Sequence, residues 1–547
     1  MKDIPPRTCV SPLGRFVYGI HKPQYTVTNL REKDHLVRLG HVNGKKEVDN
    51  RINFPPDDMA VNDADWVFEV ANPFPFMGAT YLLKSSADRR AGNANPFRSD
   101  HGPADASRGY ENAVKEAGGN DPLLISLGRT STDPNLLVEL AKKSCSLEFN
   151  PETKAPVGIE YEESDGPMPR PHITNRHLFE IVSNNPSLPD AYKQAMVLLP
   201  GIQGGNRIVG EYERPPKTHI WEYLRNNSYI PWGHYAANMA HDAVRYRIGA
   251  LDHRDMTGLR HLYYQRVYTQ LAGGMNIPLP ARRRTLTEEE LESMRKSLFE
   301  AVKGHLDKKD TRVPFNATLW GWNFGFDLSP SGYRLNASHQ QIHQQFALIP
   351  PLVPGFENGE NNESSMHLPT YIQGDDVALF CRRYKEQTGK DFFDAYIAAI
   401  QNNERMDGLK EKNKSLIFYE DENVMAFVPK AQRSQGEVQI MTKAKCGNIL
   451  ETGIRVRRSI DRAILVLMRA LEGLGVEMMA ACEISKRFDN PDTDQRLLYI
   501  FLPRHAQSPG TLSEQQNRWI IGQYPEDFAH SCQKEVERLT IFEDTSK

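Results

Sequence analysis

Three polar residues that alternate along the chain, Gln341, His343 and Gln345, are the best candidates for chemistry in this sequence. On a β-strand they project from one face, because successive side chains of a strand point to opposite sides. An imidazole is neutral and nucleophilic near pH 7, and the flanking carboxamides can donate hydrogen bonds without carrying charge. The pattern therefore favours covalent phosphoryl-group chemistry at His343. The alternative is a polar turn that contains a histidine by chance.

Residues 323–345 resemble the active-site strand of the galactose-1-phosphate uridylyltransferase branch of the histidine-triad superfamily, which also includes diadenosine tetraphosphate phosphorylases. That family has Asn-x-Gly, then a turn ending in Ser, then His-x-His-x-Gln. The resemblance implies that His343 attacks the α-phosphorus of a nucleotide and becomes a nucleotidyl-histidine, with Gln345 as the family glutamine. It also implies that Asn323 and Ser338 contact the substrate.

Gln341 stands where the family normally has its first histidine, which is a metal ligand in zinc-containing members. We expect Gln341 to contact substrate instead. In a second interpretation the strand begins with a bulge, and His339 replaces the missing histidine. The six cysteines are widely scattered and form no Cys-x-x-Cys pair, so the sequence indicates neither a zinc knuckle nor a redox dithiol. We expect no metal and no other cofactor.

A second segment, residues 415–427, resembles the opening hairpin of a histidine-triad unit, in which a strand ends in Asp-Glu, turns at Asn and returns. Residues 437–441 then resemble the next strand, residues 443–450 the start of a helix, and residues 496–504 the closing strand. The alternating histidines of the family's closing motif are absent. The resemblance therefore implies a degenerate, structural repeat.

The opening hairpin of the first, catalytic unit is expected at residues 66–76. In the uridylyltransferases an Asn-x-Phe at this place lines the base and ribose pocket, which implies substrate contacts for Asn72 and Phe74. The alternative is that the aromatic residue belongs to the core.

Together these patterns predict an α+β fold with two histidine-triad-like units, each an antiparallel sheet with helices, and a large, mainly helical insertion in the first unit. The first unit comprises residues 1–84 and 316–370. The insertion, residues 85–315, begins as a polar excursion. Bridging helices and the second unit follow at 371–547.

Several helices are predicted from apolar stripes and end signals. A capping box of Thr287 and Glu290 opens one of them. The helix at 459–474 is expected to end at Gly475, with a strand at 476–483 after it. Two bridging helices are predicted at 376–387 and 391–406.

The bulk composition is that of an ordinary soluble protein, with 39% hydrophobic and 25% charged residues among 547. No apolar run is long enough to cross a membrane, the first residues lack a secretory core, and a net charge of −3 argues against generic nucleic-acid binding. We expect a cytoplasmic protein that binds neither nucleic acid nor membrane.

Other candidate motifs are weaker. The glycine-rich residues 201–210 lack the lysine and Ser/Thr of a P-loop, and a plain loop is the favoured interpretation, with Arg207 as a possible phosphate contact. Five histidines between His219 and His261 form no metalloprotease pair. The run Arg282–Arg284 is interpreted as a solvated face.

The resemblance implies a nucleotidyltransferase that moves a nucleoside monophosphate group from a nucleotide or nucleotide sugar to a phosphate or sugar-phosphate acceptor. A glutamine at position 345 cannot titrate, which favours an already ionised phosphate acceptor over water. Three alternatives stay open: a dinucleoside polyphosphate or nucleotide-sugar phosphorylase, a nucleotide hydrolase, and a catalytically inactive nucleotide-binding protein.

Overall fold

The computed structural model places the chain from residue 7 to residue 544, apart from several stretches. The residues it does not describe are 1–6, 23, 29–36, 43–45, 52–56, 62–64, 92–120, 163–169, 184, 186, 194, 197–252, 283, 307–312, 326–342, 356–366, 477, 491–493, 505–510 and 545–547.

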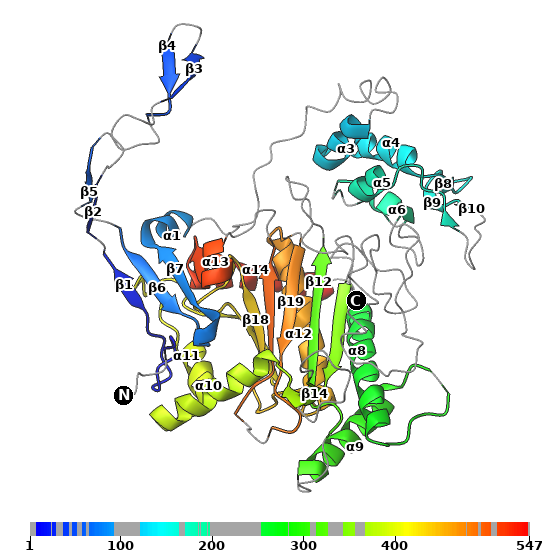
Figure 1. Cartoon of the computed structure of the whole chain (residues 1–547), viewed down its shortest axis with the longest axis vertical. Helices are drawn as coiled ribbons and strands as arrows, with labels where there is room; N and C mark the ends of the chain where they lie inside the picture. Colours follow the sequence, from blue (N-terminus) through cyan, green and yellow to red (C-terminus); the bar gives the residue numbers. More distant parts are fainter. Residues whose placement is uncertain are drawn as a thin grey trace.

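A seven-stranded antiparallel sheet forms the centre of the molecule, with the strand order β13-β12-β19-β20-β18-β17-β16 (Figure 1). Its strands are β12 (Ala317–Gly325), β13 (His343–Ile349), β16 (Ile417–Glu420), β17 (Val424–Phe427), β18 (Val438–Thr442), β19 (Met478–Ile484) and β20 (Leu498–Pro503). With its helices this sheet confirms the α+β class. The strands expected in two units, however, join one continuous sheet, and the division into two units stays a prediction.

The predicted elements of the second half form at or near their expected places. β16 and β17 are the hairpin of residues 415–427, and β20 is the closing strand. The expected helix at 459–474 is α12 (Ile454–Gly473), and Gly475 follows it with the left-handed φ of 92° that favours glycine after a helix. No helix starts within 443–450, because the Asn448 side chain accepts from the amides of Leu450 and Glu451 and holds a turn there.

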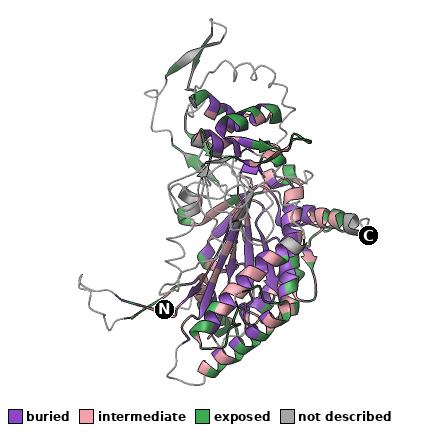
Figure 2. Cartoon of the chain, turned by 90° about the vertical axis from the view of Figure 1, so that its right-hand side faces the viewer, coloured by how far each residue is buried: buried purple, intermediate pink, exposed green. Residues whose placement is uncertain are grey.

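Four of the helices that the structure describes cover one face of the sheet, which we call the helical face. They are α8 (His253–Gly274), α9 (Glu288–Leu306), α12 and α14 (Pro525–Asp544). Figure 2 shows the buried residues gathered between strands and helices. α9 begins at the predicted capping box: Thr287 N donates to Glu290 Oε2 over 2.8 Å, and Glu290 N donates to Thr287 Oγ1 over 3.2 Å.

The other face, called the open face below, is covered over part of its area by α10 (Gln373–Thr388) and α11 (Phe392–Gln401), the two predicted bridging helices (Figure 1). A four-stranded sheet also contributes to this second core. Its strands, in order, are β1 (Gly19–His21), β6 (Val67–Ala71), β7 (Ala79–Leu83) and β21 (Arg518–Ile521).

The hairpin expected at 66–76 forms from β6 and β7, but its returning strand starts only at Ala79. Pro73 and Pro75 lack the amide hydrogens that a strand ladder needs, and residues 75–77 form a 3₁₀ turn instead. The hairpin pairs with the C-terminal strand β21, which runs parallel to β7, and it is not part of the seven-stranded sheet.

Residues 121–196 pack around a hydrophobic cluster of their own. The elements there are α3 (Asp121–Thr130), α4 (Pro134–Ser144), β8 (Leu147–Phe149), β9 (Pro156–Ile159), β10 (Tyr161–Glu162), β11 (Arg170–Pro171), α5 (Arg176–Ser183) and α6 (Asp190–Lys193). In contrast, α8 and α9 belong to the core under the seven-stranded sheet. The domain boundaries expected around 85–315 stay a prediction.

Short elements complete the described chain: β2 (Tyr25–Val27), β3 (Arg38–Val42), β4 (Lys46–Asp49), β5 (Met59–Val61), α1 (Lys84–Arg90), β14 (Leu352–Pro354), β15 (His367–Pro369) and α13 (Thr511–Gln516). Among the helices that the structure describes, none combines the length and the apolar character needed to cross a bilayer.

Candidate functional site

Two neighbouring strands carry the residues expected to do chemistry. β12 and β13 pair antiparallel, with Asn323 directly opposite His343 and Gly321 directly opposite Gln345. The sequence separates Asn323 from His343 by a stretch that lies outside the described residues, and the strand register makes their backbones neighbours. Residues opposite each other in an antiparallel pair have Cβ atoms about 4.5–5.5 Å apart. This register brings two of the predicted site residues into one row.

Gln344 anchors β13 from the helical face. Its side chain is buried, and its Oε1 accepts from Trp320 Nε1 over 2.8 Å. Its Nε2 lies 3.4 Å from the carbonyl oxygen of Leu259 on α8. Because side chains alternate along a strand, positions 343 and 345 belong to the open face. The predicted common face of these two positions therefore agrees with the register.

The other predicted residues of this motif are not placed. Ser338, Gln341 and His339 lie outside the described residues. Their roles as substrate contacts, and the second interpretation for His339, stay predictions.

Asn72 and Phe74 lie in the core between the four-stranded sheet and α10–α11. Asn72 Nδ2 donates to the carbonyl of Ala431 over 3.3 Å, and Asn72 Oδ1 accepts from the amide of Phe74 over 3.1 Å. Phe74 is 2% exposed and packs against the rings of Phe380, Phe392, Phe393 and Tyr396. This burial fits the alternative of a core residue for Phe74, and the substrate contacts of both residues stay predictions.

Two rows of paired residues cross the sheet, one from His343 and one from Gln345. Near these two residues the rows have small side chains on the open face. Ala480, Cys482 and Gly321 are each partly exposed. The two rows are His343–Asn323–Ala480–Leu502 and Gln345–Gly321–Cys482–Ile500–Gln439.

At the far end of the second row lies a polar group that sequence reasoning missed: Arg433, Glu437 and Gln439. Arg433 Nε is 3.7 Å from Glu437 Oε1, which also accepts from Gln439 Nε2 over 2.8 Å. Burial raises the pKa of Cys482, and the nearby guanidinium of Arg433 partly offsets this. The sequence signal for this group is the run of four polar residues at 432–435, which lies in the loop between two apolar strands. Loops between strands often carry the residues of a binding or catalytic site.

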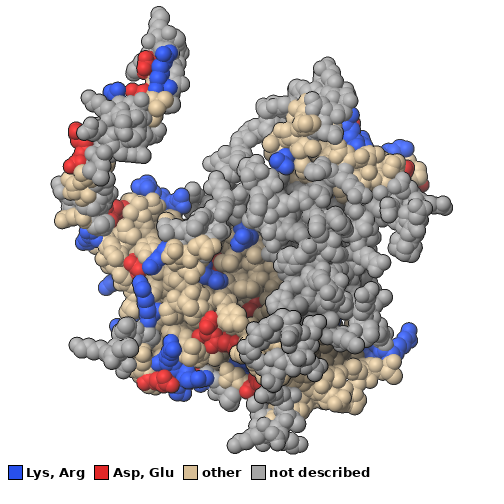
Figure 3. Space-filling view, viewed as in Figure 1, with Lys and Arg blue, Asp and Glu red and all other residues tan. Residues whose placement is uncertain are grey.

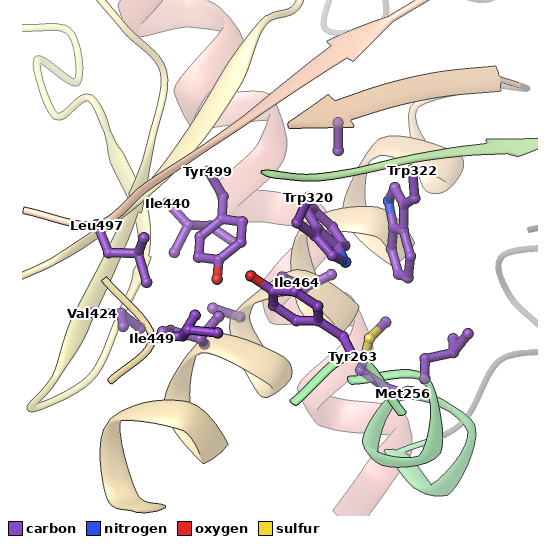
Figure 4. Close-up of a cluster of buried hydrophobic side chains, with 14 of the residues drawn as sticks. Met256, Tyr263, Trp320, Trp322, Val424, Ile440, Ile449, Ile464, Leu497 and Tyr499 are labelled. Atoms are coloured by element: carbon purple, nitrogen blue, oxygen red, sulfur yellow. The ribbon is translucent and has the colours of Figure 1, made fainter. Parts of the chain in front are cut away.

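A buried charged network lies on the helical face behind the candidate site, and sequence analysis did not identify it either. Arg260 of α8, which has no exposed surface, donates from Nε to Asp461 Oδ1 over 3.0 Å and from Nη2 to the hydroxyls of Tyr264 and Tyr499. Tyr499 and Tyr263 in turn donate to Glu483 over 2.5 and 3.1 Å. Figure 4 shows the hydroxyl groups of Tyr263 and Tyr499 directed toward one another.

Burial dominates the protonation behaviour of this network. It raises the pKa of Asp461 from 3.8 to about 6, although Arg260 and Tyr264 oppose the shift. It also raises the pKa of Glu483, against the effects of Arg260 and Tyr499. These groups connect α8 with α12, β19 and β20. They therefore fix α8 against the same sheet that contains β12 and β13.

One group of carboxylates in the described part of the chain could hold a metal ion: Asp391, Asp394 and Asp494. Three basic side chains already form ion pairs with these carboxylates. Lys385 lies 2.7 Å from Asp391, Lys445 3.4 Å from Asp391, and Arg496 2.8 Å from Asp394. The group therefore forms an ion-pair network at the end of α10, and it includes no predicted site residue.

Because Gln341 replaces the first motif histidine, we predict that activity survives treatment with EDTA and that purified protein holds less than stoichiometric zinc, measured by plasma emission spectrometry. A neutral amide is a poor zinc ligand beside histidine and thiolate. Zinc that copurifies at one equivalent and is lost in His339→Asn would instead assign His339 the ligand role.

The weaker motifs give no competing site within the described residues. Residues 201–210, including Arg207, and the histidines His219, His234 and His241 lie outside them. His253 and His261 bond to Thr257 and Gln265 on their own helix. Arg284, 43% exposed, forms a bidentate pair with Glu290, as suits a solvated face.

No family model matches the chain, and no curated protein matches it in sequence. Solved structures match part of it. A uridylyltransferase mutant is 15% identical over 45% of this chain and 72% of its own, with a TM-score of 0.31. An ADP-glucose phosphorylase from Arabidopsis thaliana with bound ADP-glucose is 12% identical over 44% and 65%, with a TM-score of 0.30. A GalT-like protein from the same plant is 13% identical over 44% and 67%, with a TM-score of 0.29.

Proposed function

We propose that this protein transfers a nucleoside monophosphate group in two displacements through a covalent nucleotidyl-histidine at His343. The observation that carries the proposal is the register of β12 and β13, which puts Asn323 opposite His343 and Gly321 opposite Gln345. It supports the proposal because it sets the positions of the Asn, His and Gln of the motif on one face of the sheet.

In the first step a ring nitrogen of His343 attacks the α-phosphorus of a nucleoside diphosphate compound. The N–P bond forms, the bond to the bridging oxygen breaks, and the leaving phosphate or sugar phosphate takes the electron pair. In the second step an oxygen of a phosphate-bearing acceptor attacks the same phosphorus, and the electrons of the N–P bond return to His343.

Amide groups suit the surroundings of such a phosphorus. The side chain of Gln345 can donate to a phosphoryl oxygen, and it can neither supply nor remove a proton. An ionised phosphate acceptor needs no general base, whereas water does. Transfer to phosphate is therefore favoured over hydrolysis.

The proposal predicts ping-pong kinetics. With a panel of nucleotide sugars, dinucleoside polyphosphates and phosphate acceptors, double-reciprocal plots of the productive pair should be parallel. Label should also exchange between the first substrate and its first product with no acceptor present. Mass spectrometry of the protein with the donor alone should find a nucleotidyl adduct on the peptide that contains His343.

Each other outcome points to one of the alternatives. An acceptor requirement met by inorganic phosphate alone identifies a phosphorylase, and turnover without any acceptor identifies a hydrolase. Intersecting plots without exchange mean direct transfer in a ternary complex, with His343 as a binding residue. Binding of nucleotides without turnover or adduct means an inactive nucleotide-binding protein.

A further inference from the structure

β13 is an edge strand of the seven-stranded sheet, and its own sequence does not fix which face its residues take. Among the described strands it pairs with β12 alone. Its first three residues, 343–345, are polar on both faces, and its last four, 346–349, are apolar on both faces. Strand register is strongly specified where a polar face and an apolar face alternate along the chain. Contacts from outside the strand must therefore hold the end that carries position 343.

Gln344 supplies such contacts at the polar end of β13. Its side chain is 3% exposed, and its Oε1 accepts from Trp320 Nε1 of β12 over 2.8 Å. Its Nε2 donates to the carbonyl oxygen of Leu259 on α8 over 3.4 Å. The first bond runs diagonally across the strand pair, because the residue directly opposite Gln344 is Trp322. One side chain thus ties the edge strand both to its neighbouring strand and to the helix that covers it.

Trp320, the donor of the first bond, is itself closely packed. It is 3% exposed, and the guanidinium carbon of Arg260 lies 4.7 Å from the centre of its ring. The rings of Trp322 and Tyr499 lie on either side, with their centres 5.3 and 5.6 Å away (Figure 4). An indole packed in this way has little freedom to rotate, so the direction of its N–H is fixed. Leu259 and Arg260, consecutive on α8, therefore act on the same glutamine, one directly and one through Trp320.

A buried glutamine adds direction to this contact. Charged side chains of the described residues are spread over the surface, where water solvates them (Figure 3). The amide of Gln344 is instead in the core, where its hydrogen bonds do little more than offset the loss of water. Hydrogen bonds weaken steeply away from their preferred angles, whereas apolar contacts have no direction. What Gln344 contributes is therefore a fixed position of the strand, and the residue next to it is His343.

We propose that Gln344 is a positioning residue, which holds the backbone of β13 so that position 343 stays opposite Asn323 on the open face. This inference rests on the proposed function, because it concerns the support of the nucleophile in that mechanism. The side chain of Gln344 points to the helical face, so it acts through the strand and not on the substrate. Its loss should slow the attack on phosphorus and leave donor binding unchanged, because a shift of about 1 Å can cost about 10²-fold in rate.

The test measures how fast Gln344→Met forms the nucleotidyl adduct. The full chain is mixed with the donor that labels the unaltered protein, without acceptor, then quenched rapidly and weighed by mass spectrometry. Methionine keeps the length of glutamine and removes both hydrogen bonds. The rate constant at saturating donor should fall about 10- to 100-fold. The donor concentration that gives half the maximal rate should change less than about twofold. The final amount of adduct, which counts competent molecules, should stay the same.

A second variant separates positioning from an unpaired donor. Gln344→Met leaves Trp320 Nε1 buried without its partner. Combining it with Trp320→Phe removes that donor, so the double variant should melt at a higher temperature than Gln344→Met and form the adduct as slowly. A purely structural role would instead lower the final amount of adduct and leave the rate constant of the remaining molecules normal.

Tyr268→Phe is the matched control. Tyr268 is fully buried on α8, and its hydroxyl donates to the carbonyl oxygen of Ile449, which is not part of β13, over 2.8 Å. The variant should lower the melting temperature by loss of one buried hydrogen bond and keep the normal rate constant.

Three results overturn the inference and leave the proposed function standing: a normal rate constant in Gln344→Met, a rate restored in the double variant, or equal slowing in Tyr268→Phe. If the unaltered protein forms no adduct with any nucleotide sugar or dinucleoside polyphosphate, the proposed function and the inference are both contradicted.

Discussion

Replacing His343 by Asn should lower turnover by at least about 10⁴-fold, because an amide cannot form the covalent intermediate on which the proposed route depends. The fold should be unaffected. Gln344, its neighbour on the helical face, is buried and accepts a hydrogen bond from Trp320, and the variant keeps both residues. Initial rates with the productive donor and acceptor measure the effect, and circular dichroism and thermal melting check the fold.

His253→Asn is the control for loss of an imidazole, since His253 is exposed on α8 and bonds only within its own helix turn among the described residues. It should retain full activity. The adduct found in the unaltered protein should be missing from His343→Asn. A folded His343→Asn protein that turns over at the normal rate would remove the central claim of the proposed mechanism.

Replacing Arg260 by Met should lower the free energy of unfolding by about 3–5 kcal/mol, the usual cost of breaking a buried ion pair by removing one partner. Arg260 is completely buried, bonds to Asp461 and two tyrosines, and lies 4.7 Å from the centre of the Trp320 ring. Without it, Asp461 loses its ion-pair partner in the core and keeps the hydrogen bond from Tyr264 and the more distant charge of Arg457. Urea titration followed by tryptophan fluorescence measures the loss.

The loss of unfolding free energy in Arg260→Met should grow as the pH rises. Asp461 already has a folded-state pKa of about 6, above its ordinary 3.8, because burial favours the protonated form. Its native state therefore binds more protons than the unfolded state between these values, and stability falls as pH rises through this window. Removing the guanidinium raises the pKa of Asp461 further, so the fall in stability continues above pH 6. The other groups that face Arg260 are Glu483, whose pKa burial also raises, and Tyr263, Tyr264 and Tyr499.

Two further variants separate charge from packing. Adding Asp461→Asn to Arg260→Met removes the stranded carboxylate, so it should restore part of the stability and flatten the pH dependence. Arg458→Met breaks an exposed pair with Glu288, in which the arginine side chain is 61% exposed, and should have little effect. A loss in Arg260→Met that does not change between pH 5 and 8 would mean that packing, and not charge, makes Arg260 important.

Local patterns in the sequence were sufficient for the elements that depend on neighbouring residues. The Thr287–Glu290 capping box, the stripe of Ile460, Ile464 and Leu467 on α12, and Gly475 after it all stand where periodicity and end signals predicted them. The reason is that helix caps, amphipathic spacing and left-handed glycines involve residues within a few positions of each other. The alternation at His343 and Gln345 belongs to the same class, and it predicted their common face.

The sequence by itself therefore determined the α+β class and most strands and helices of the second half, and the roles of the motif around His343 stay a prediction. Only the tertiary structure decided the pairings between distant residues. It joined β12 and β13 to β19 in one sheet, put the C-terminal β21 beside β7, and brought Arg260 to Asp461 across 201 positions. It also placed Gln439 of β18 in the same row of the sheet as position 345, four strands away. Such contacts depend on which apolar faces bury each other and on strand register, and no short-range pattern in one chain specifies either.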